Sequence, residues 1–221
     1  MEKVMQEPMG VERVTLEGEY VRLEPLAIEH LDALCEFGLD EELWRWSPAP
    51  MRTRQELRAY IEAALKERDA GIALPFVTIH RALGRPVGST RYGNIDGANR
   101  RVEIGWTWIG RTWQRTAVNT EAKFLMLRHA FEELRCFRVE LKTDSLNERS
   151  RNAILRLGAK EEGIFRNHMI TSSGRLRHTV YYSILDSEWS AVKKRLEEKL
   201  SQPEQADRGQ VGGGSGTGGM G

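Results

Sequence analysis

The sequence predicts an α/β fold of the α+β type, in which helices pack on a mixed β-sheet. The order of patterns along the chain is strand, two helices, three strands, helix, strand, helix, two strands and helix. The three strand-like runs between residues 72 and 110 are joined by the short turns ALGRP and DGAN, which are typical of an antiparallel meander. With 221 residues, the chain is long enough to bury one core.

Composition and termini limit the classes of function. The 33 Lys+Arg residues almost balance the 32 Asp+Glu residues, so no overall field favours nucleic acid or an anionic membrane. No run approaches the roughly 18 apolar residues of a membrane span, and MEKVMQEPMGVERV lacks the apolar stretch of a secretory signal. Cys35 and Cys136 form no CxxC pair, and the five histidines lack ligand spacing. We therefore expect a cytoplasmic protein with reduced thiols and no metal, as a monomer or homodimer.

Three segments are expected along the chain. Residues 1–14 are predicted to be a flexible segment, and residues 15–200 a single domain. Residues 201–221, SQPEQADRGQVGGGSGTGGMG, have almost nothing to bury and are predicted to be a flexible, disordered tail.

The first half of the domain shows clear local signals. YVRLEPL (20–26) predicts a strand and residues 27–38 a helix. Thr53 followed by Glu56 predicts a capping box at the start of a second helix, which Gly71 ends. In the third run of the meander, alternation predicts Val102, Ile104, Trp106 and Trp108 on one face, with Glu103, Gly105 and Thr107 on the other. A carboxylate beside a glycine on a buried strand is a candidate for chemistry.

The second half continues with a helix whose apolar residues recur at 3, 4, 3 spacing (Phe124, Leu127, Phe131, Leu134). A strand over 137–142 follows, and then a short helix that Gly158 ends. Two strands joined by SSGR and a final helix over 187–200 complete the domain.

The segment WQRTAVNT (113–120) is a candidate anion site. It lies between an apolar strand and a helix, and a helix start presents unpaired N–H groups and the positive end of the helix dipole. Arg115 can add a charged contact, and Thr116 or Asn119 can cap the helix or bind a phosphate oxygen. Ala117 is compatible with such a site because residues in helical conformation do not require glycine. The alternative is a capped helix start with no ligand.

The stretch EIGWTWIGRTWQRTAVNTEAKFLMLRHAFEELRCFRVELKTDSLNERSRNAILRLGA resembles the core of the GNAT-superfamily N-acetyltransferases, in particular the RimJ/RimL branch, and a weaker similarity covers residues 14–200. The similarity lies in the strand, loop and long helix, where that family has Q/R-x-x-G-x-G/A, and in Asn147, Ser150, Leu157 and Gly158, which match N-x-x-S followed by L-G. The resemblance implies a mostly antiparallel central sheet flanked by helices and acetyl-CoA as cosubstrate.

The resemblance also implies residue roles. In this family the loop holds the pyrophosphate of acetyl-CoA, and the preceding strand and an asparagine bind the pantetheine. The cofactor-binding residues implied here are Trp108, Ile109, Gly110, Gln114, Arg115, Thr116, Ala117, Val118, Asn119, Thr120 and Asn147. The sequence differs from many relatives at Ile154, where they have a tyrosine general acid, and at His178, where this branch often has aspartate.

Acetyl transfer to an amine requires a base, because an amine of pKa near 10 is mostly protonated at neutral pH. By the resemblance, Glu103 is the candidate base; the alternative is an ion pair with Arg100 or Arg101. Ser150 is the candidate donor to the departing thiolate, or it only caps a helix.

The expected partner is an amine-bearing acceptor, either a peptide or protein N-terminus or a small molecule. Trp44 and Trp46 are candidate walls of its pocket, or they only pack. No sequence feature indicates a covalent intermediate, so direct attack in a ternary complex is expected. The alternative function is a non-catalytic module that binds coenzyme A or a protein partner.

Overall fold

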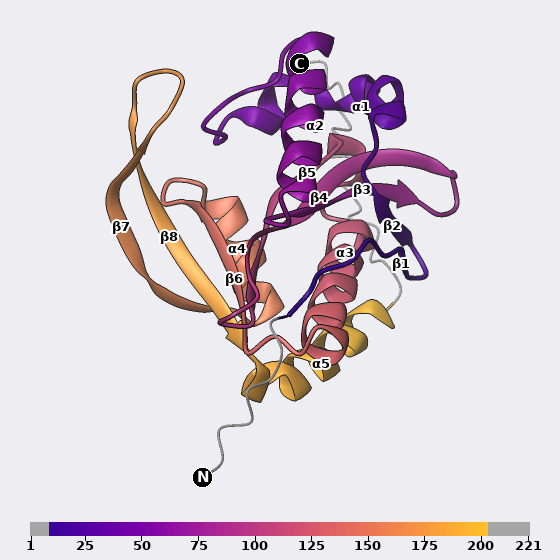
Figure 1. Ribbon diagram of the computed structural model, residues 1–221, viewed down its shortest axis with the longest axis vertical. Coiled ribbons are helices and arrows are strands. Elements are labelled where there is room, and N and C mark those ends of the chain that lie inside the picture. Colours follow the sequence, from indigo (N-terminus) through magenta and orange to yellow (C-terminus); the bar gives the residue numbers. More distant parts are fainter. Residues whose placement is uncertain (1–8, 203–221) are drawn as a thin grey trace, which may run out of the picture.

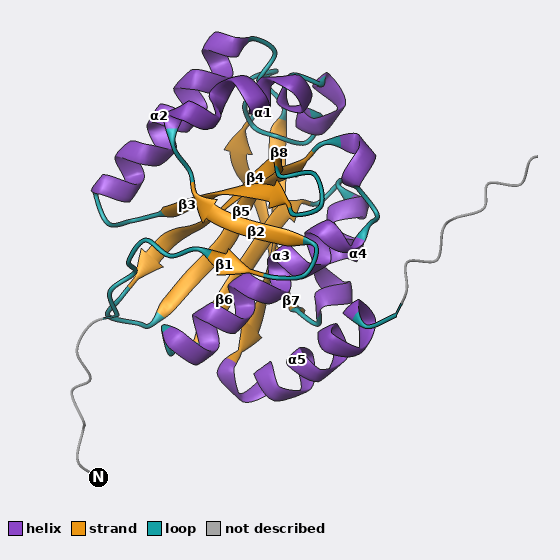
Figure 2. Cartoon of the chain, turned by 90° about the vertical axis from the view of Figure 1, so that its right-hand side faces the viewer, coloured by secondary structure: helices purple, strands orange, loops and turns teal. Residues whose placement is uncertain are grey.

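The computed structural model describes residues 9–202, which form one eight-stranded sheet with helices on both faces (Figures 1 and 2). The strand order is β1-β2-β3-β4-β5-β6-β8-β7, and every neighbouring pair is antiparallel except β5 and β6. The strands are β1 (Leu16–Glu17), β2 (Val21–Pro25), β3 (Leu74–His80), β4 (Arg85–Asp96), β5 (Arg101–Ile109), β6 (Arg138–Asp144), β7 (Lys160–Ile170) and β8 (Leu176–Leu185). The α-helices are α1 (Leu31–Gly38), α2 (Arg54–Asp69), α3 (Ala117–Arg128), α4 (Glu148–Leu157) and α5 (Asp186–Leu200). The predicted fold class is confirmed.

The helices divide between the two faces of the sheet, as Figure 2 shows. The larger core cluster joins α3, α4 and α5 to one face through side chains such as Leu127 and Ile154. A smaller cluster joins α1 and α2 to the other face through Leu34, Leu57 and Ile61. The long β7–β8 hairpin extends away from the rest of the sheet (Figure 1).

The capping signals in the sequence are confirmed. The Thr53 hydroxyl accepts from the Glu56 N–H at 3.2 Å, and the Glu56 carboxylate accepts from the Thr53 N–H at 2.9 Å. Gly158 follows α4 with φ of 104°, a left-handed conformation that glycine adopts without a steric cost.

The predicted alternation along β5 is wrong after Ile104. Trp106 has φ of 50°, and the pairing with β4 shifts register between Ser89/Trp108 and Arg91/Gly105, which marks a β-bulge. A bulge inserts a residue and reverses which face the following side chains occupy. Trp108 therefore packs in the cluster of α1 and α2, whereas Val102 and Ile104 lie in the cluster of α3.

The parallel strands β5 and β6 separate along their length. Their paired residues run only from Arg101/Arg138 to Glu103/Glu140, although β5 continues to Ile109 and β6 to Asp144. Because the strands are parallel, their carboxyl ends lie at the same end of the sheet, beyond the last paired residues. The helices α3 and α4 follow these ends, so the sheet opens toward two helix starts. We use the name β5–β6 cleft for the stretch between β5 and β6 that begins at the last paired residues, Glu103 and Glu140, and continues where the strands are no longer paired.

The expected terminal segments lie largely outside the described residues. The structure does not describe residues 1–8 and 203–221. Met9 is buried at 8% exposure, and its N–H donates to the Gly97 carbonyl at 3.2 Å. The domain therefore makes contacts from residue 9 onward.

Residues 9–202 contain neither a membrane-spanning helix nor a candidate metal site. None of the helices within 9–202 is both long and apolar enough to cross a membrane. In the same range, no group of three or more His, Cys, Asp or Glu residues is arranged to hold a metal ion.

A buried carboxylate on α3 fixes the turn between β1 and β2. Glu121 is 5% exposed and accepts three backbone N–H groups, from Glu19, Tyr20 and Val21, at 2.6 to 2.7 Å. A Cβ at Gly18 would lie 2.3 Å from the Glu121 carboxyl carbon, so the carboxylate fills the space that a side chain would need. This contact joins the start of the domain to its central helix.

We expect Glu121→Ala to lower the free energy of unfolding by about 3 to 5 kcal/mol, because three backbone N–H groups lose a buried charged acceptor. Urea denaturation measures the loss. Glu62→Ala is the matched control: Glu62 pairs with Arg58 on the surface of α2, and such a pair contributes at most about 1 kcal/mol. Equal losses in the two variants would contradict the structural role of Glu121.

Candidate active site

The closed end of the β5–β6 cleft contains a buried carboxylate. Glu103 is 3% exposed, and its Oε2 accepts from Asn94 Nδ2 at 2.7 Å and from Lys142 Nζ at 2.9 Å. The partners suggested by the sequence, Arg100 and Arg101, make other contacts: Arg100 donates to carbonyls of the α3–β6 connection, and Arg101 pairs with acidic side chains.

One oxygen of Glu103 accepts no hydrogen bond from the described residues. The contacts with Asn94 and Lys142 both use Oε2. A Cβ at Gly105 would lie 2.9 Å from Oε1, so the absence of a side chain at Gly105 accommodates the carboxylate. Oε1 is therefore the oxygen that can accept a proton from a ligand.

A mixed-charge cavity of about 450 Å³ opens over this carboxylate. Lys142, the partner of Glu103, has its Nζ 5.7 Å from the Trp106 ring centroid and 5.6 Å from that of Tyr181. The lining of the cavity includes both acidic and basic side chains, so the cavity suits a polar ligand. Its lining residues are Asn94, Arg101, Glu103, Arg138, Glu140, Glu162, Gly163, Phe165 and Tyr181.

At the open end of the cleft, the loop before α3 is tightly folded. Thr116 is the N-cap of α3, and its hydroxyl accepts from the Val118 N–H at 3.3 Å. Ala117 is the first helical residue, which agrees with the expectation that it does not need the freedom of glycine. Arg115 does take up a left-handed conformation with φ of 66°, a conformation for which glycine is the usual residue.

Gln114 connects three parts of the cleft. Its Nε2 donates to the Ile109 carbonyl at 2.8 Å, and its Oε1 accepts from Arg149 Nη2 at 2.6 Å. The starts of α3 and α4 therefore lie side by side, and Arg149 adds positive charge between them. The Ile109 carbonyl is engaged by Gln114, while the Gly110 N–H donates to the Val87 carbonyl at 2.8 Å.

The first turn of α3 has an unsatisfied polar atom. Asn119 Oδ1 is buried and has no hydrogen-bond partner, which is uncommon in a folded protein. Val118 is buried in the core, while Thr120 is half-buried. With the positive end of its dipole and the unpaired Asn119 oxygen, this turn fits an anionic ligand that also carries a hydrogen-bond donor.

Asn147 and Ser150 lie at the start of α4. The Asn147 Oδ1 accepts from the Ser150 N–H at 3.0 Å, so Asn147 is the N-cap. Within residues 9–202 neither the Asn147 Nδ2 nor the Ser150 Oγ makes a hydrogen bond, and both residues are half-buried. Ile154 lies one turn further on and is 7% exposed in the larger core.

The two tryptophans before α2 differ in position. Trp44 is 6% exposed, donates its indole N–H to the Gly38 carbonyl at 2.7 Å, and packs on Trp108 at 5.6 Å between ring centroids. Trp46 is half-buried and lies below the guanidinium groups of Arg45 and Arg175. Trp44 therefore offers little surface to an acceptor, and Trp46 offers more.

Some site residues were not found by sequence reasoning. Asn94 and Lys142 hold Glu103, yet each occurs in an ordinary strand pattern. Lys123 is 6% exposed on α3, and burial lowers its pKa to about 7. The available signal was the nearly continuous apolar character of α3, because any charged residue in a helix buried on most sides must itself be buried.

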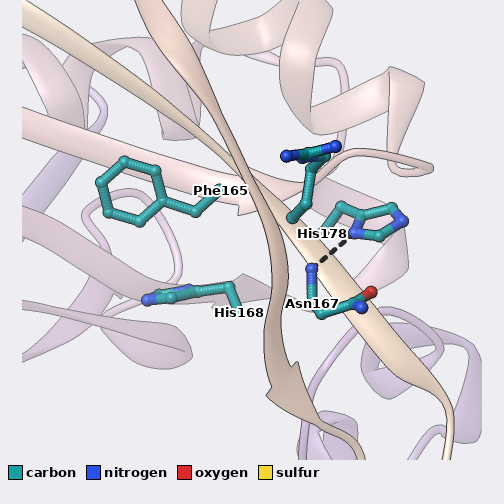
Figure 3. Close-up of a pocket in the computed structure, with 5 residues that line it drawn as sticks. Phe165, Asn167, His168 and His178 are labelled. Carbon is teal, nitrogen blue, oxygen red and sulfur yellow. Dashed lines mark hydrogen bonds between the residues drawn. The ribbon is translucent and has the colours of Figure 1, made fainter.

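A second, open cavity of about 830 Å³ lies against the β7–β8 hairpin, as Figure 3 shows. Its lining includes His178, whose Nδ1 accepts from the Asn167 backbone N–H at 2.7 Å. His178 thus holds the strand β7 in place. Phe165 lines both this cavity and the one over Glu103.

Comparisons with known proteins identify the family to which the chain belongs. The family model described as an acetyltransferase (GNAT) domain matches residues 21–160. A crystal structure of a GCN5-related N-acetyltransferase from Brucella melitensis is 37% identical, with a TM-score of 0.81 over 90% of this chain and 90% of that one. The fold is also similar to Mycobacterium smegmatis RimJ in complex with CoA-disulfide, at 24% identity and a TM-score of 0.72 over 85% of this chain and 93% of that one.

Two curated proteins are similar in sequence. The "putative ribosomal N-acetyltransferase YdaF" of Bacillus subtilis (strain 168) is 37% identical over 100 residues, which are 45% of this chain and 54% of that protein. The "uncharacterized N-acetyltransferase p20" of Bacillus licheniformis is 26% identical over 80% of this chain and 98% of its own length. The chain belongs to the GNAT family of acetyltransferases.

Proposed function

We propose that the chain transfers an acetyl group from acetyl-CoA to the primary amine of an acceptor by direct attack in a ternary complex. The observation that carries this proposal is the β5–β6 cleft, which has the buried Glu103 at its closed end and two helix starts at its open end. Acetyl-CoA supplies the thioester whose carbonyl carbon is the electrophile.

The open end of the cleft fits the cosubstrate. The α3 start offers N–H groups and a positive dipole to phosphate, and Arg115 and Arg149 add charge beside it. The Asn147 amide nitrogen donates to the pantetheine in this proposal. Asn119 Oδ1, which is buried without a hydrogen-bond partner, accepts from a donor group of the cosubstrate. In this proposal the binding residues are Trp108, Ile109, Gly110, Gln114, Arg115, Thr116, Ala117, Val118, Asn119, Thr120 and Asn147.

The closed end supplies the base. Glu103 accepts the proton of the acceptor ammonium at Oε1, while Asn94 and Lys142 hold Oε2 and fix the carboxylate. At the other end, the Ser150 hydroxyl donates to the departing thiolate, a role that Ile154 cannot fill because its side chain is apolar. Glu103 lies on β5, and Ser150 lies on α4, the helix that follows β6.

The acceptor is proposed to be the N-terminus of a protein or peptide. The cavity over Glu103 is lined by acidic and basic side chains that can bind a polar main chain, and Trp46 is the more accessible of the two tryptophans. The name of the Bacillus subtilis relative points to a ribosomal protein. The alternative acceptor is a small-molecule amine, which would be acetylated by the same reaction.

The test measures free thiol from acetyl-CoA with a panel of N-terminal peptides and small amines. We expect thiol release only with acceptors that fit, together with acetylated product identified by mass spectrometry. Calorimetry measures acetyl-CoA binding separately. Binding without thiol release for any acceptor would support a non-catalytic coenzyme A-binding module instead, and the absence of binding would contradict both functions.

A further inference from the structure

A buried lysine lies behind the β5 wall of the cleft. Lys123, on the second turn of α3, donates from Nζ to the Thr107 hydroxyl at 2.5 Å and to the Thr90 hydroxyl at 3.1 Å. The two hydroxyl oxygens are 2.8 Å apart, so the three groups form a closed triangle between α3, β4 and β5. Within the described residues no carboxylate pairs with Lys123.

A buried amine without a counter-ion is costly, and burial alone lowers the pKa of Lys123 to about 7. Another buried polar group that contacts α3 is satisfied, since the Tyr92 hydroxyl donates to the Met126 carbonyl at 2.5 Å. Packing alone would favour an apolar side chain at position 123. A lysine at position 123 therefore indicates a function that depends on its charge or its hydrogen bonds.

The triangle opens on one side only. Lys123 and Thr90 are buried at 6% and 1% exposure, whereas Thr107 is exposed. Thr107 lies on β5 beyond Glu103, on the stretch that has separated from β6. The Thr107 oxygen accepts from Lys123, and its own hydrogen lies within reach of the Gly105 carbonyl at 3.3 Å. This contact is longer than an ordinary O–H···O hydrogen bond, so a ligand carbonyl on the exposed side of Thr107 can replace it.

We propose that Thr107 is a catalytic hydrogen-bond donor to the acetyl carbonyl oxygen, and that Lys123 is a positioning residue that orients and polarises the Thr107 hydroxyl. The donor is set in place before the reaction by its contacts with Lys123 and Thr90. Such a donor stabilises the oxygen as it gains negative charge when the amine attacks. The positive charge of Lys123 increases the acidity of the hydroxyl that it contacts, which strengthens this hydrogen bond.

Thr107 and Glu103 lie on opposite faces of β5. The bulge at Trp106 turns Thr107 toward α3, whereas Glu103 faces the cavity beside β7. The acceptor amine and the acetyl carbonyl can therefore approach the cleft from the two faces of the sheet. This proposal rests on the acetyl transfer proposed above.

The test compares Thr107→Val, Thr107→Ser and Lys123→Met. Valine has the shape of threonine without its hydroxyl, and serine keeps the hydroxyl. We expect Thr107→Val to lower kcat by about 10²-fold, as for the loss of one oxyanion donor, with little change in the acceptor KM. Lys123→Met should lower kcat by a smaller factor, and Thr107→Ser should stay close to the wild type. Thr78→Val, a buried threonine of β3, is the control.

A second readout does not require turnover. Infrared spectroscopy of bound acetyl-CoA with an isotope-labelled carbonyl measures polarisation of that bond. We expect a lowered stretching frequency in the wild type and Thr107→Ser, and a return toward the solution value in Thr107→Val and Lys123→Met. An unchanged band and an unchanged kcat in Thr107→Val would overturn the proposal.

The two proposals fail in different ways. A wild type that binds acetyl-CoA, shows the lowered frequency and releases no thiol would contradict acetyl transfer and support the hydrogen bond. A wild type that releases thiol while Thr107→Val matches it in both measurements would contradict only the role of Thr107. A wild type that does not bind acetyl-CoA would contradict both.

Discussion

Replacement of Glu103 by glutamine is expected to slow acetyl transfer at neutral pH by about 10² to 10³-fold, the range typical for loss of a general base. The amide of Glu103→Gln keeps the size of the side chain but cannot take a proton from the acceptor ammonium. Binding of acetyl-CoA should change little, because Glu103 lies at the closed end of the cleft and the helix starts lie at the open end. Thiol release under saturating acetyl-CoA measures the first effect, and calorimetry measures the second.

The pH dependence of the variant gives a further check. Without a base, reaction requires the small fraction of acceptor that is already neutral, and this fraction rises with pH toward the amine pKa. The deficit of Glu103→Gln should therefore shrink as the pH is raised. A deficit that stays constant with pH would indicate a positioning role for Glu103 in place of proton transfer.

Glu132→Gln is the matched control for charge and folding. Glu132 also pairs with a lysine, Lys193, at 2.8 Å, but it lies beside α5. Circular dichroism and thermal unfolding of both variants show whether folding is retained. A rate loss of equal size in Glu132→Gln would mean that Glu103 acts through stability and would contradict its role as a base.

The sequence predicted the fold because the fold depends largely on local signals. Capping boxes, alternation and hairpin turns are set by residues close in sequence, as at Thr53 and Gly158, and these were confirmed. The strand Arg101–Ile109 was likewise located from pattern, and Thr116, one of the two caps that the sequence allowed, is the cap of α3. The family resemblance supplied the chemistry that connects them.

The parts that were not predicted depend on contacts between distant segments. A single inserted residue at Trp106 reverses the faces of Thr107 and Trp108, and periodicity cannot show a bulge before the pairing of β4 and β5 is known. Lys142 comes to Glu103 only because β6 pairs parallel with β5. The same bulge places Thr107 against Lys123. The cluster of Lys123, Thr90 and Thr107 therefore depends on a feature that the sequence pattern could not predict.

Lys123→Met is expected to stabilise the protein while it impairs catalysis. The shift of the Lys123 pKa from 10.5 to about 7 corresponds to on the order of 5 kcal/mol of unfavourable free energy for the buried ammonium. Methionine has a similar length, fits a core and removes this cost, although the hydrogen bonds to the two threonines are lost. We expect a net gain of about 2 to 4 kcal/mol in the free energy of unfolding at pH 6, measured by urea denaturation.

The gain should depend on pH with a definite sign. Because the pKa is lowered in the folded state, the unfolded chain binds more protons than the folded protein between pH 7 and 10.5. Through Lys123, the wild type therefore becomes more stable as the pH rises through this window, and the advantage of Lys123→Met is largest below pH 7 and falls above it. Lys193→Met, which removes a lysine paired with Glu132 at 35% side-chain exposure, should show no such trend. A gain that does not vary with pH would mean that Lys123 is not held as a destabilising charge, whereas a stabilised and slower enzyme would show that folding stability is given up at this position for the hydrogen bond to Thr107.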